Sequence, residues 1–135
     1  MRTINEIIIH CSATKEGKAF TVADIDRWHR NRGFASIGYH YVIYLDGSVH
    51  EGRPLALSGA HCTGHNKQSI GVCYIGGLDA AGRPHDTRTS EQRQALLTLL
   101  ETLKKRFQNA TIHGHNEFSN KACPCFDVRA EYGQL

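Results

Sequence analysis

The sequence is short of the features that mark membrane, disordered and fibrous proteins. Only three prolines interrupt its 135 residues, and no repeat or low-complexity stretch occurs. The N-terminal end holds only the short aliphatic run Ile7-Ile8-Ile9, which is too brief for a signal-peptide core or a membrane span. We therefore expect synthesis in the cytoplasm without a signal peptide, and no membrane partner.

An excess of charge of one sign is also missing. The formal net charge is +3, which favours encounter with an anionic surface but differs from the dense basic patch of a nucleic-acid-binding protein. Hydrophobic residues make up 40% and charged residues 21%, an ordinary globular balance. We expect residues 1–135 to form a single domain that is a monomer and binds no nucleic acid.

Close cysteine pairs of the C-x-x-C type, which usually announce a structural zinc site, are absent as well. The five cysteines are odd in number, so they cannot all pair within one chain. Cys73 lies in an apolar run, where a buried free thiol is expected. The thiols are therefore predicted to be reduced.

Hydrophobic patterning predicts an α/β fold with a central mixed β-sheet of about five strands, flanked by two to three α-helices. Short β-branched or apolar runs place the strands at residues 4–10, 39–45, 48–51, 69–76 and 111–113. Asp46-Gly47 predicts a hairpin turn. The order of the strands in the sheet cannot be predicted.

Two threonines, each followed three residues later by a side chain that completes a capping box, predict the starts of helices at Thr21 and Thr89. The first helix is expected to end at Gly33 and the second at Phe107. A stripe at helical spacing gives the second helix its apolar face: Leu96, Leu99, Leu100 and Leu103. The segment between Gly76 and Thr89 is expected to be a loop.

Among nine histidines, His10 stands out because it ends a predicted strand, where a rigid sheet presents side chains to a site. The segment His113-Gly114-His115, at the end of another short strand, can bring a second imidazole beside it, and His115 is the candidate that the family motifs described below favour. Cys123 adds a thiolate to these two imidazoles. Two nitrogens and one sulfur suit zinc, and three protein ligands leave the fourth position open, as in catalytic sites. His10 and His115 are far apart in sequence, so spacing by itself gives this hypothesis no support.

Strand alternation separates neighbouring side chains near these residues. Tyr39 and His40 should point to opposite faces of the sheet, as should His10 and Cys11. Cys11 is therefore expected to be a buried thiol and no ligand. By periodicity alone, Tyr39 is as consistent with a core tyrosine as with a catalytic one.

Five motifs occur in order along the chain: HCSAT at 10–14, GYHY at 38–41, GAH at 59–61, SIGV at 69–72 and KACP at 121–124. Together they resemble the N-acetylmuramoyl-L-alanine amidase family, which includes small phage amidases and animal peptidoglycan recognition proteins. The resemblance runs from about Ile4 to about Val128. It implies a mixed sheet with a zinc cleft on one face, and hydrolysis of the amide between N-acetylmuramic acid and L-alanine in bacterial peptidoglycan.

By position, His10, His115 and Cys123 resemble the family's Zn²⁺ ligands, and Tyr39 and Lys121 resemble its two non-metal catalytic residues. Loop residues His61 and Asn66 are candidate substrate contacts. Asn116 and Cys125 depart from the phage branch, where a second histidine and a small hydroxyl residue are usual. Neither departure touches the proposed ligands.

Two other functions compete with the amidase. Non-catalytic recognition proteins typically lose the cysteine ligand, so the retained Cys123 favours an enzyme over a peptidoglycan-binding module. A protein-binding regulator is the second alternative, because a phage relative restrains a viral RNA polymerase, but no residue here indicates such an interface. Without a signal peptide, an enzyme of the cell wall would reach it after release or by dedicated export.

Overall fold

Five strands of the computed structural model, which describes residues 1–135, form one sheet in the order β4-β3-β5-β1-β7. The central strand β1 (Glu6–Cys11) is parallel to β5 (Ser69–Tyr74) on one side and to β7 (Thr111–Gly114) on the other. Beyond β5, β3 (Tyr41–Ile43) is also parallel, and the edge strand β4 (Val49–Glu51) is antiparallel.

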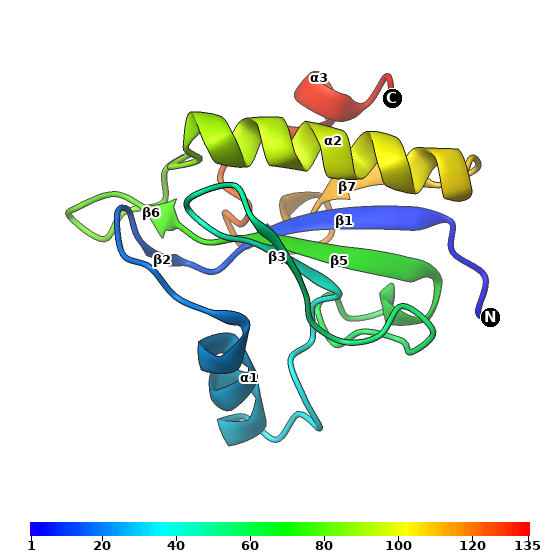
Figure 1. Ribbon diagram of the computed structural model, residues 1–135, viewed down its shortest axis with the longest axis horizontal. Coiled ribbons are helices and arrows are strands. Elements are labelled where there is room, and N and C mark those ends of the chain that lie inside the picture. The colour runs from blue at the N-terminus through cyan, green and yellow to red at the C-terminus, as the bar shows by residue number, and fades with distance from the viewer.

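Helices cover both faces of this sheet (Figure 1). The long helix α2 (Ser90–Arg106) and the short C-terminal helix α3 (Val128–Tyr132) lie on one side, and α1 (Val22–Asn31) lies on the other. Both predicted capping boxes are present, with Thr21 and Thr89 as the N-cap residues. The predicted α/β class, a mixed sheet flanked by helices, is confirmed.

Alternation along β1 divides the core into two layers. Ile7, Ile9 and Cys11 pack with the leucines of α2 and with α3, in a cluster of 15 buried residues. The intervening side chains, Ile8 and His10, point to the other face, where a smaller cluster includes Ile25 of α1. The side chain of His10 is therefore delivered to the face opposite α2.

The strands differ from expectation at their ends. The predicted strand 39–45 is shorter, because the ladder stops where Tyr44 N–H donates to Ser48 O in the hairpin turn. The segment expected to be a loop contains β6 (Gly77–Leu78), which pairs with β2 (Thr14–Lys15) as a second small sheet. Two-residue strands leave no periodic pattern to find in a sequence.

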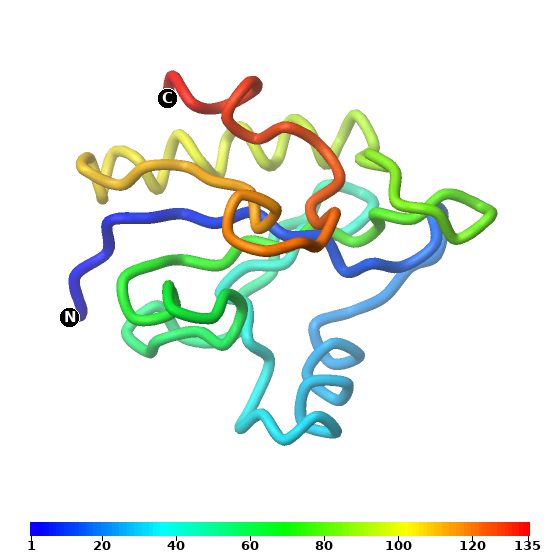
Figure 2. Tube along the Cα trace, turned by 180° about the vertical axis from the view of Figure 1, so that it is seen from behind, coloured from blue at the N-terminus to red at the C-terminus, as the bar shows by residue number.

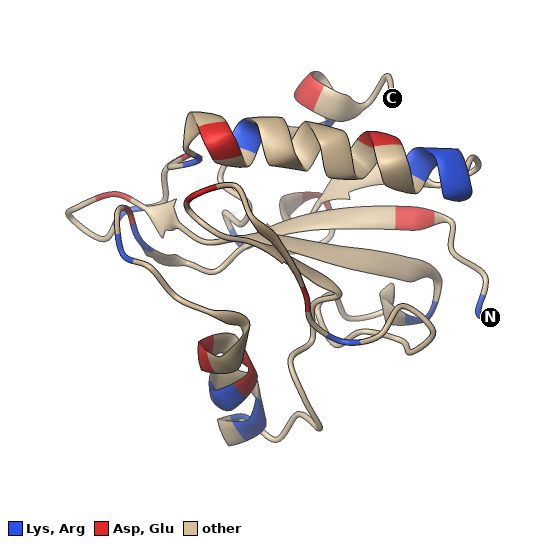
Figure 3. Cartoon of the chain, in the orientation of Figure 1, with Lys and Arg blue, Asp and Glu red and all other residues tan.

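Charged side chains are spread over the molecule, as Figure 3 shows for one view. The C-terminal turn of α2 gathers Lys104, Lys105 and Arg106, where positive charge is favourable to the helix dipole. No helix combines the length and the hydrophobicity that a membrane-spanning segment needs.

Candidate active site

Two histidines meet at the edge of the sheet where the parallel strands end. Ile9 of β1 pairs with Gly114 of β7, so the next residues in register are His10 and His115. His115 begins the short 3₁₀ helix η2 (His115–Glu117), and its ring centroid lies 4.6 Å from that of His10. Carboxyl ends of parallel strands are where α/β folds place their sites.

Cys123 reaches the same point from the loop after η2. Its Sγ lies 3.8 Å from His10 Nδ1 and accepts a hydrogen bond of 3.2 Å from the Cys11 backbone N–H. Figure 2 shows this orange loop beside the end of β1. The ligand atoms of His10, His115 and Cys123 all lie within 4.8 Å of one another, which makes this group a candidate metal centre.

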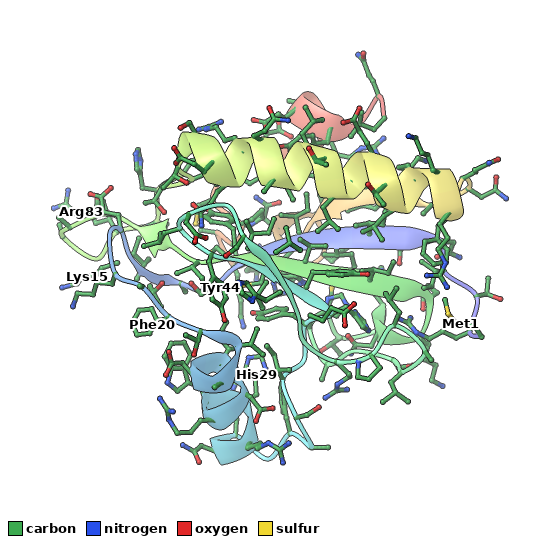
Figure 4. The ribbon with its side chains drawn as sticks, viewed as in Figure 1. Met1, Lys15, Phe20, His29, Tyr44 and Arg83 are labelled. Carbon is green, nitrogen blue, oxygen red and sulfur yellow. The ribbon has the colours of Figure 1, made fainter.

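The three side chains open into a cleft of about 590 Å³. One wall comes from α1 and the segment after it, where Figure 4 labels His29, and the other from the loops before β5 and after β7. The side chains lining these walls include Trp28, His29, Arg32, Phe34, Tyr39, His61, Asn66, Phe118 and Lys121. An aromatic, partly cationic cleft of this size suits an extended polar ligand.

Burial keeps the imidazoles neutral. Desolvation, reinforced by the neighbouring His61 and His115, holds the pKa of His10 well below its usual value. Desolvation and the charge of Lys121 also lower the pKa of His115. Neutral imidazole is the form that binds a metal, so both rings are ready for that role at neutral pH.

Tyr39 and Lys121 flank this group from different elements. The Tyr39 ring lies 5.1 Å from the His10 ring, and burial raises the pKa of its hydroxyl, which therefore keeps its proton. Lys121 is exposed at the cleft, close enough for its charge to act on His10. His40 does not line this cleft, and its Nδ1 accepts the Gly71 N–H. Tyr39 and His40 both precede β3, so the predicted strand alternation does not apply to them.

The two predicted substrate contacts also lie at the cleft, but both bond to the protein itself. Asn66 Oδ1 accepts the backbone N–H groups of His61 and Cys62, which fixes the shape of this loop. The ring nitrogens of His61 bond to His10 and Ser69. The assignment of both as substrate contacts stays a prediction, and His61 has no ring nitrogen free for it.

The wall formed by α1 was not predicted. Trp28 and His29 line the cleft from this helix, Arg32 lines it from the helix C-cap, and Phe34 follows. His29 Nδ1 also accepts the Gly38 N–H, which ties α1 to the segment before β3. The spacing of Trp28 and Arg32, four residues apart, puts them on one helix face and was the available indication.

Comparison with known proteins decides the family. A family model described as N-acetylmuramoyl-L-alanine amidase matches residues 1–126. The chain belongs to the N-acetylmuramoyl-L-alanine amidase family. The endolysin of Klebsiella phage KP32 is 42% identical over 125 residues, which is 93% of this chain and 83% of that protein. The endolysin of Escherichia phage T7 is 42% identical over 123 residues, covering 91% and 82%.

A solved structure agrees with this assignment. The N-acetylmuramoyl-L-alanine amidase LysC from Clostridium intestinale superposes with a TM-score of 0.82 at 25% identity, over 96% of this chain and 85% of that one. The protein is thus an amidase that hydrolyses the bond between N-acetylmuramic acid and L-alanine in peptidoglycan. The alternative function as a peptidoglycan-binding module without catalytic activity is therefore not supported.

Proposed function

We propose that His10, His115 and Cys123 hold one Zn²⁺ ion, and that Tyr39 and Lys121 are the catalytic residues of this amidase. The observation that carries the proposal is the convergence of two imidazoles and one thiol within 4.8 Å at the floor of the cleft.

The donor set and its spacing fit zinc. In a tetrahedral site, Zn–N bonds of about 2.0–2.1 Å and a Zn–S bond of about 2.3 Å separate nitrogen and sulfur by roughly 3.6 Å. The distance from His10 Nδ1 to Cys123 Sγ is 3.8 Å. The Cys11 N–H aimed at Cys123 Sγ supports the same role, because a hydrogen bond to sulfur stabilises a thiolate. Three protein ligands are the number found in catalytic zinc sites.

The substrate amide is a poor electrophile, and water is a poor nucleophile at neutral pH. A bound zinc ion would address both problems, because zinc lowers the pKa of bound water to about 7 in favourable sites and polarises a carbonyl group. The protein's part is to position the scissile carbonyl beside Tyr39 and Lys121.

Negative charge develops on the carbonyl oxygen as the amide is attacked. The Tyr39 hydroxyl, protonated because burial raises its pKa, can donate a hydrogen bond to that oxygen. The Lys121 ammonium at the cleft provides a second donor and a positive charge. Each such donor typically contributes about 3 kcal/mol to the transition state. One of the two also passes a proton to the leaving amine nitrogen of L-alanine.

The cleft accommodates both parts of such a substrate. Aromatic side chains along the α1 wall, Trp28 and Phe34, offer stacking surfaces for a sugar ring, and polar loop groups face them across the cleft. We expect residues 1–135 to act as one amidase domain and as a monomer. We also expect the protein to reach the cell wall after release from the cell that makes it, or by dedicated export.

Paired serine variants test the metal assignment. Cys123→Ser removes the proposed thiolate ligand, whereas Cys125→Ser removes a thiol two residues away that bonds to Gly77 O. We expect one zinc per protein in wild type and in Cys125→Ser, and loss of both zinc and peptidoglycan cleavage in Cys123→Ser. Zinc content is measured by elemental analysis and cleavage by release of stem peptides.

Two results would reject the proposal. One is a Cys123→Ser protein that retains stoichiometric zinc, and the other is a wild type that cleaves peptidoglycan equally well after exhaustive metal removal.

A further inference from the structure

His10 is bonded through both of its ring nitrogens. Nδ1 faces Cys123 Sγ at 3.8 Å, and Nε2 lies 2.8 Å from Nδ1 of His61. The His61 ring stands at 90° to the His10 ring, and its own Nε2 lies 3.1 Å from Ser69 Oγ. His10, His61 and Ser69 thus form a chain of hydrogen bonds leading from the proposed metal position into the sheet.

The His61 ring lies in a socket made by two glycines. A Cβ atom at Gly71 would lie 2.6 Å from His61 Cδ2, and a Cβ atom at Gly59 would lie at the same distance from that atom. Any side chain at either position would displace the ring. His61 is 9% exposed and Ser69 is fully buried, so water does not compete for this chain of bonds.

The proposed ligand role of His10 determines where the protons lie in this series of hydrogen bonds. If Nδ1 of His10 binds the metal, the ring proton is on Nε2 and is donated to His61 Nδ1. His61 then carries its own proton on Nε2 and donates it to Ser69 Oγ. Metal-binding histidines generally need such a partner, which fixes the tautomer and the direction of the ring.

We propose that His61 is a positioning residue of the metal centre, holding His10 in its Nδ1-binding tautomer and orientation through the acceptor at His61 Nδ1. This inference rests on the proposed function, since it needs a metal at His10, His115 and Cys123. It gives His61 a task different from the substrate contact expected from the sequence.

Two variants whose new side chains have nearly the same shape test whether the hydrogen-bond acceptor of His61 or only its bulk is needed. His61→Asn keeps an oxygen close to the position of Nδ1, whereas His61→Leu has the same branching and no acceptor. The zinc affinity of each purified protein is measured by competition with a chromophoric chelator, and the absorption spectrum of each Co²⁺-substituted protein reports ligand geometry. Thermal unfolding of the metal-free proteins checks that the fold is kept.

We expect His61→Leu to bind zinc about 10–100-fold more weakly than wild type, with an altered Co²⁺ spectrum. His61→Asn should stay within a few-fold of wild type. Ser69→Ala, which leaves the His61 ring in place, provides a second variant if His61→Leu does not fold, and it should weaken zinc binding by a few-fold.

Several outcomes overturn the proposal. Equal zinc affinity in wild type, His61→Leu and Ser69→Ala would do so, as would equal losses in His61→Leu and His61→Asn. A raised KM for peptidoglycan fragments with unchanged zinc affinity would return His61 to substrate binding. If wild type itself binds no zinc, the proposed function fails, which is a distinguishable result.

Discussion

At the scale of single residues, the cleft combines neutral imidazoles with donors that keep their protons. Desolvation lowers the pKa of His10 and raises that of Tyr39, so burial favours the neutral form in both cases. Lys121, exposed at the rim, brings the positive charge. We propose metal binding and charge stabilisation for different side chains, so the two roles should be separable by mutation.

Removing either donor should reduce turnover and leave the metal in place. We expect Tyr39→Phe and Lys121→Met each to lower kcat by about 10²–10³-fold, because each loses one donor to the developing oxyanion. Zinc content should match wild type. Stopped assays of stem-peptide release give kcat, and elemental analysis gives the zinc content.

Matched controls exist for both variants. Tyr41→Phe changes a tyrosine that packs on the core from β3, and Lys18→Met changes an exposed lysine outside the cleft. Both should keep wild-type kcat. A Tyr39→Phe enzyme with unchanged turnover would remove Tyr39 from the mechanism.

The sequence indicated these residues unevenly. Strand alternation correctly separated His10 from Cys11, because side-chain direction in a strand is a local property. It does not apply to Tyr39 and His40, which precede β3. The approach of Cys123 to His10 joins residues 113 positions apart and depends on the path of a loop. Only the family motifs pointed to it. No local sequence pattern predicted the hydrogen bond between His61 and His10, which lie 51 positions apart.

At the scale of elements, the helix starts were the most predictable features. Each begins with a capping box, whose hydrogen bonds involve only residues three apart, so the sequence alone contains the whole interaction. Gln92 shows the limit of such an argument. Besides its capping bond to Thr89 N–H, its side-chain amide donates to Ile75 O in the sheet, which no local pattern contains.

The cap of α2 should matter more to stability than a residue in the middle of the same helix. Thr89→Ala removes the bond from Gln92 N–H and also the bond that Thr89 donates to Leu45 O. We expect a loss of about 1–2 kcal/mol in the free energy of unfolding, measured by urea titration.

Thr98 is exposed in the middle of α2 and serves as the control. Thr98→Ala should leave stability unchanged or slightly raised, because alanine has the higher helix propensity. Equal losses in the two variants would contradict the capping argument.

At the scale of the whole molecule, a buried arginine ties the C-terminal helix to the segment before α2. The Arg88 side chain is fully buried, bonds to Asp86 and to Glu131 of α3, and lies 3.5 Å from the centroid of the Phe126 ring. Phe126 follows the loop that carries Cys123. The same cluster therefore anchors both α3 and the far end of the loop that carries Cys123.

This cluster should make the free energy of unfolding depend on pH in the acidic range. Hydrogen bonds from Arg88 lower the pKa of Glu131 below its ordinary value. A lowered folded-state pKa stabilises the fold above the unfolded pKa of about 4.3 and loses that contribution as pH falls through the folded value. Urea titrations at pH 7 and below pH 4 should show this loss in wild type.

Arg88→Met should lower the free energy of unfolding by about 2–4 kcal/mol at pH 7. This is less than the usual cost of breaking a buried ion pair, because the carboxylate partners of Arg88 keep contact with water. The acid-dependent part of the stability should shrink in this variant, since Glu131 no longer has its partner. If Arg88→Met loses as much stability as wild type between pH 7 and a pH below 4, the cluster is not the source of the acid dependence.

The fold class was predictable and the strand order was not. Local periodicity reports each strand and helix, but the placement of β1 between β5 and β7 is decided by contacts between distant segments. The cleft could not be predicted for the same reason, because its walls come from α1 and from two loops that lie together only in the folded protein.

Metal-dependent cleavage of the N-acetylmuramoyl-L-alanine bond can be followed on purified peptidoglycan in one experiment. Wild-type protein, chelator-treated protein and the same sample reloaded with zinc are incubated with it, and new alanine amino termini and new reducing sugar ends are both counted. We expect new alanine amino termini with wild type, none after chelation, and recovery on adding zinc, with no new reducing ends in any sample. Reducing ends instead of alanine termini, or cleavage unaffected by chelation, would contradict this expectation.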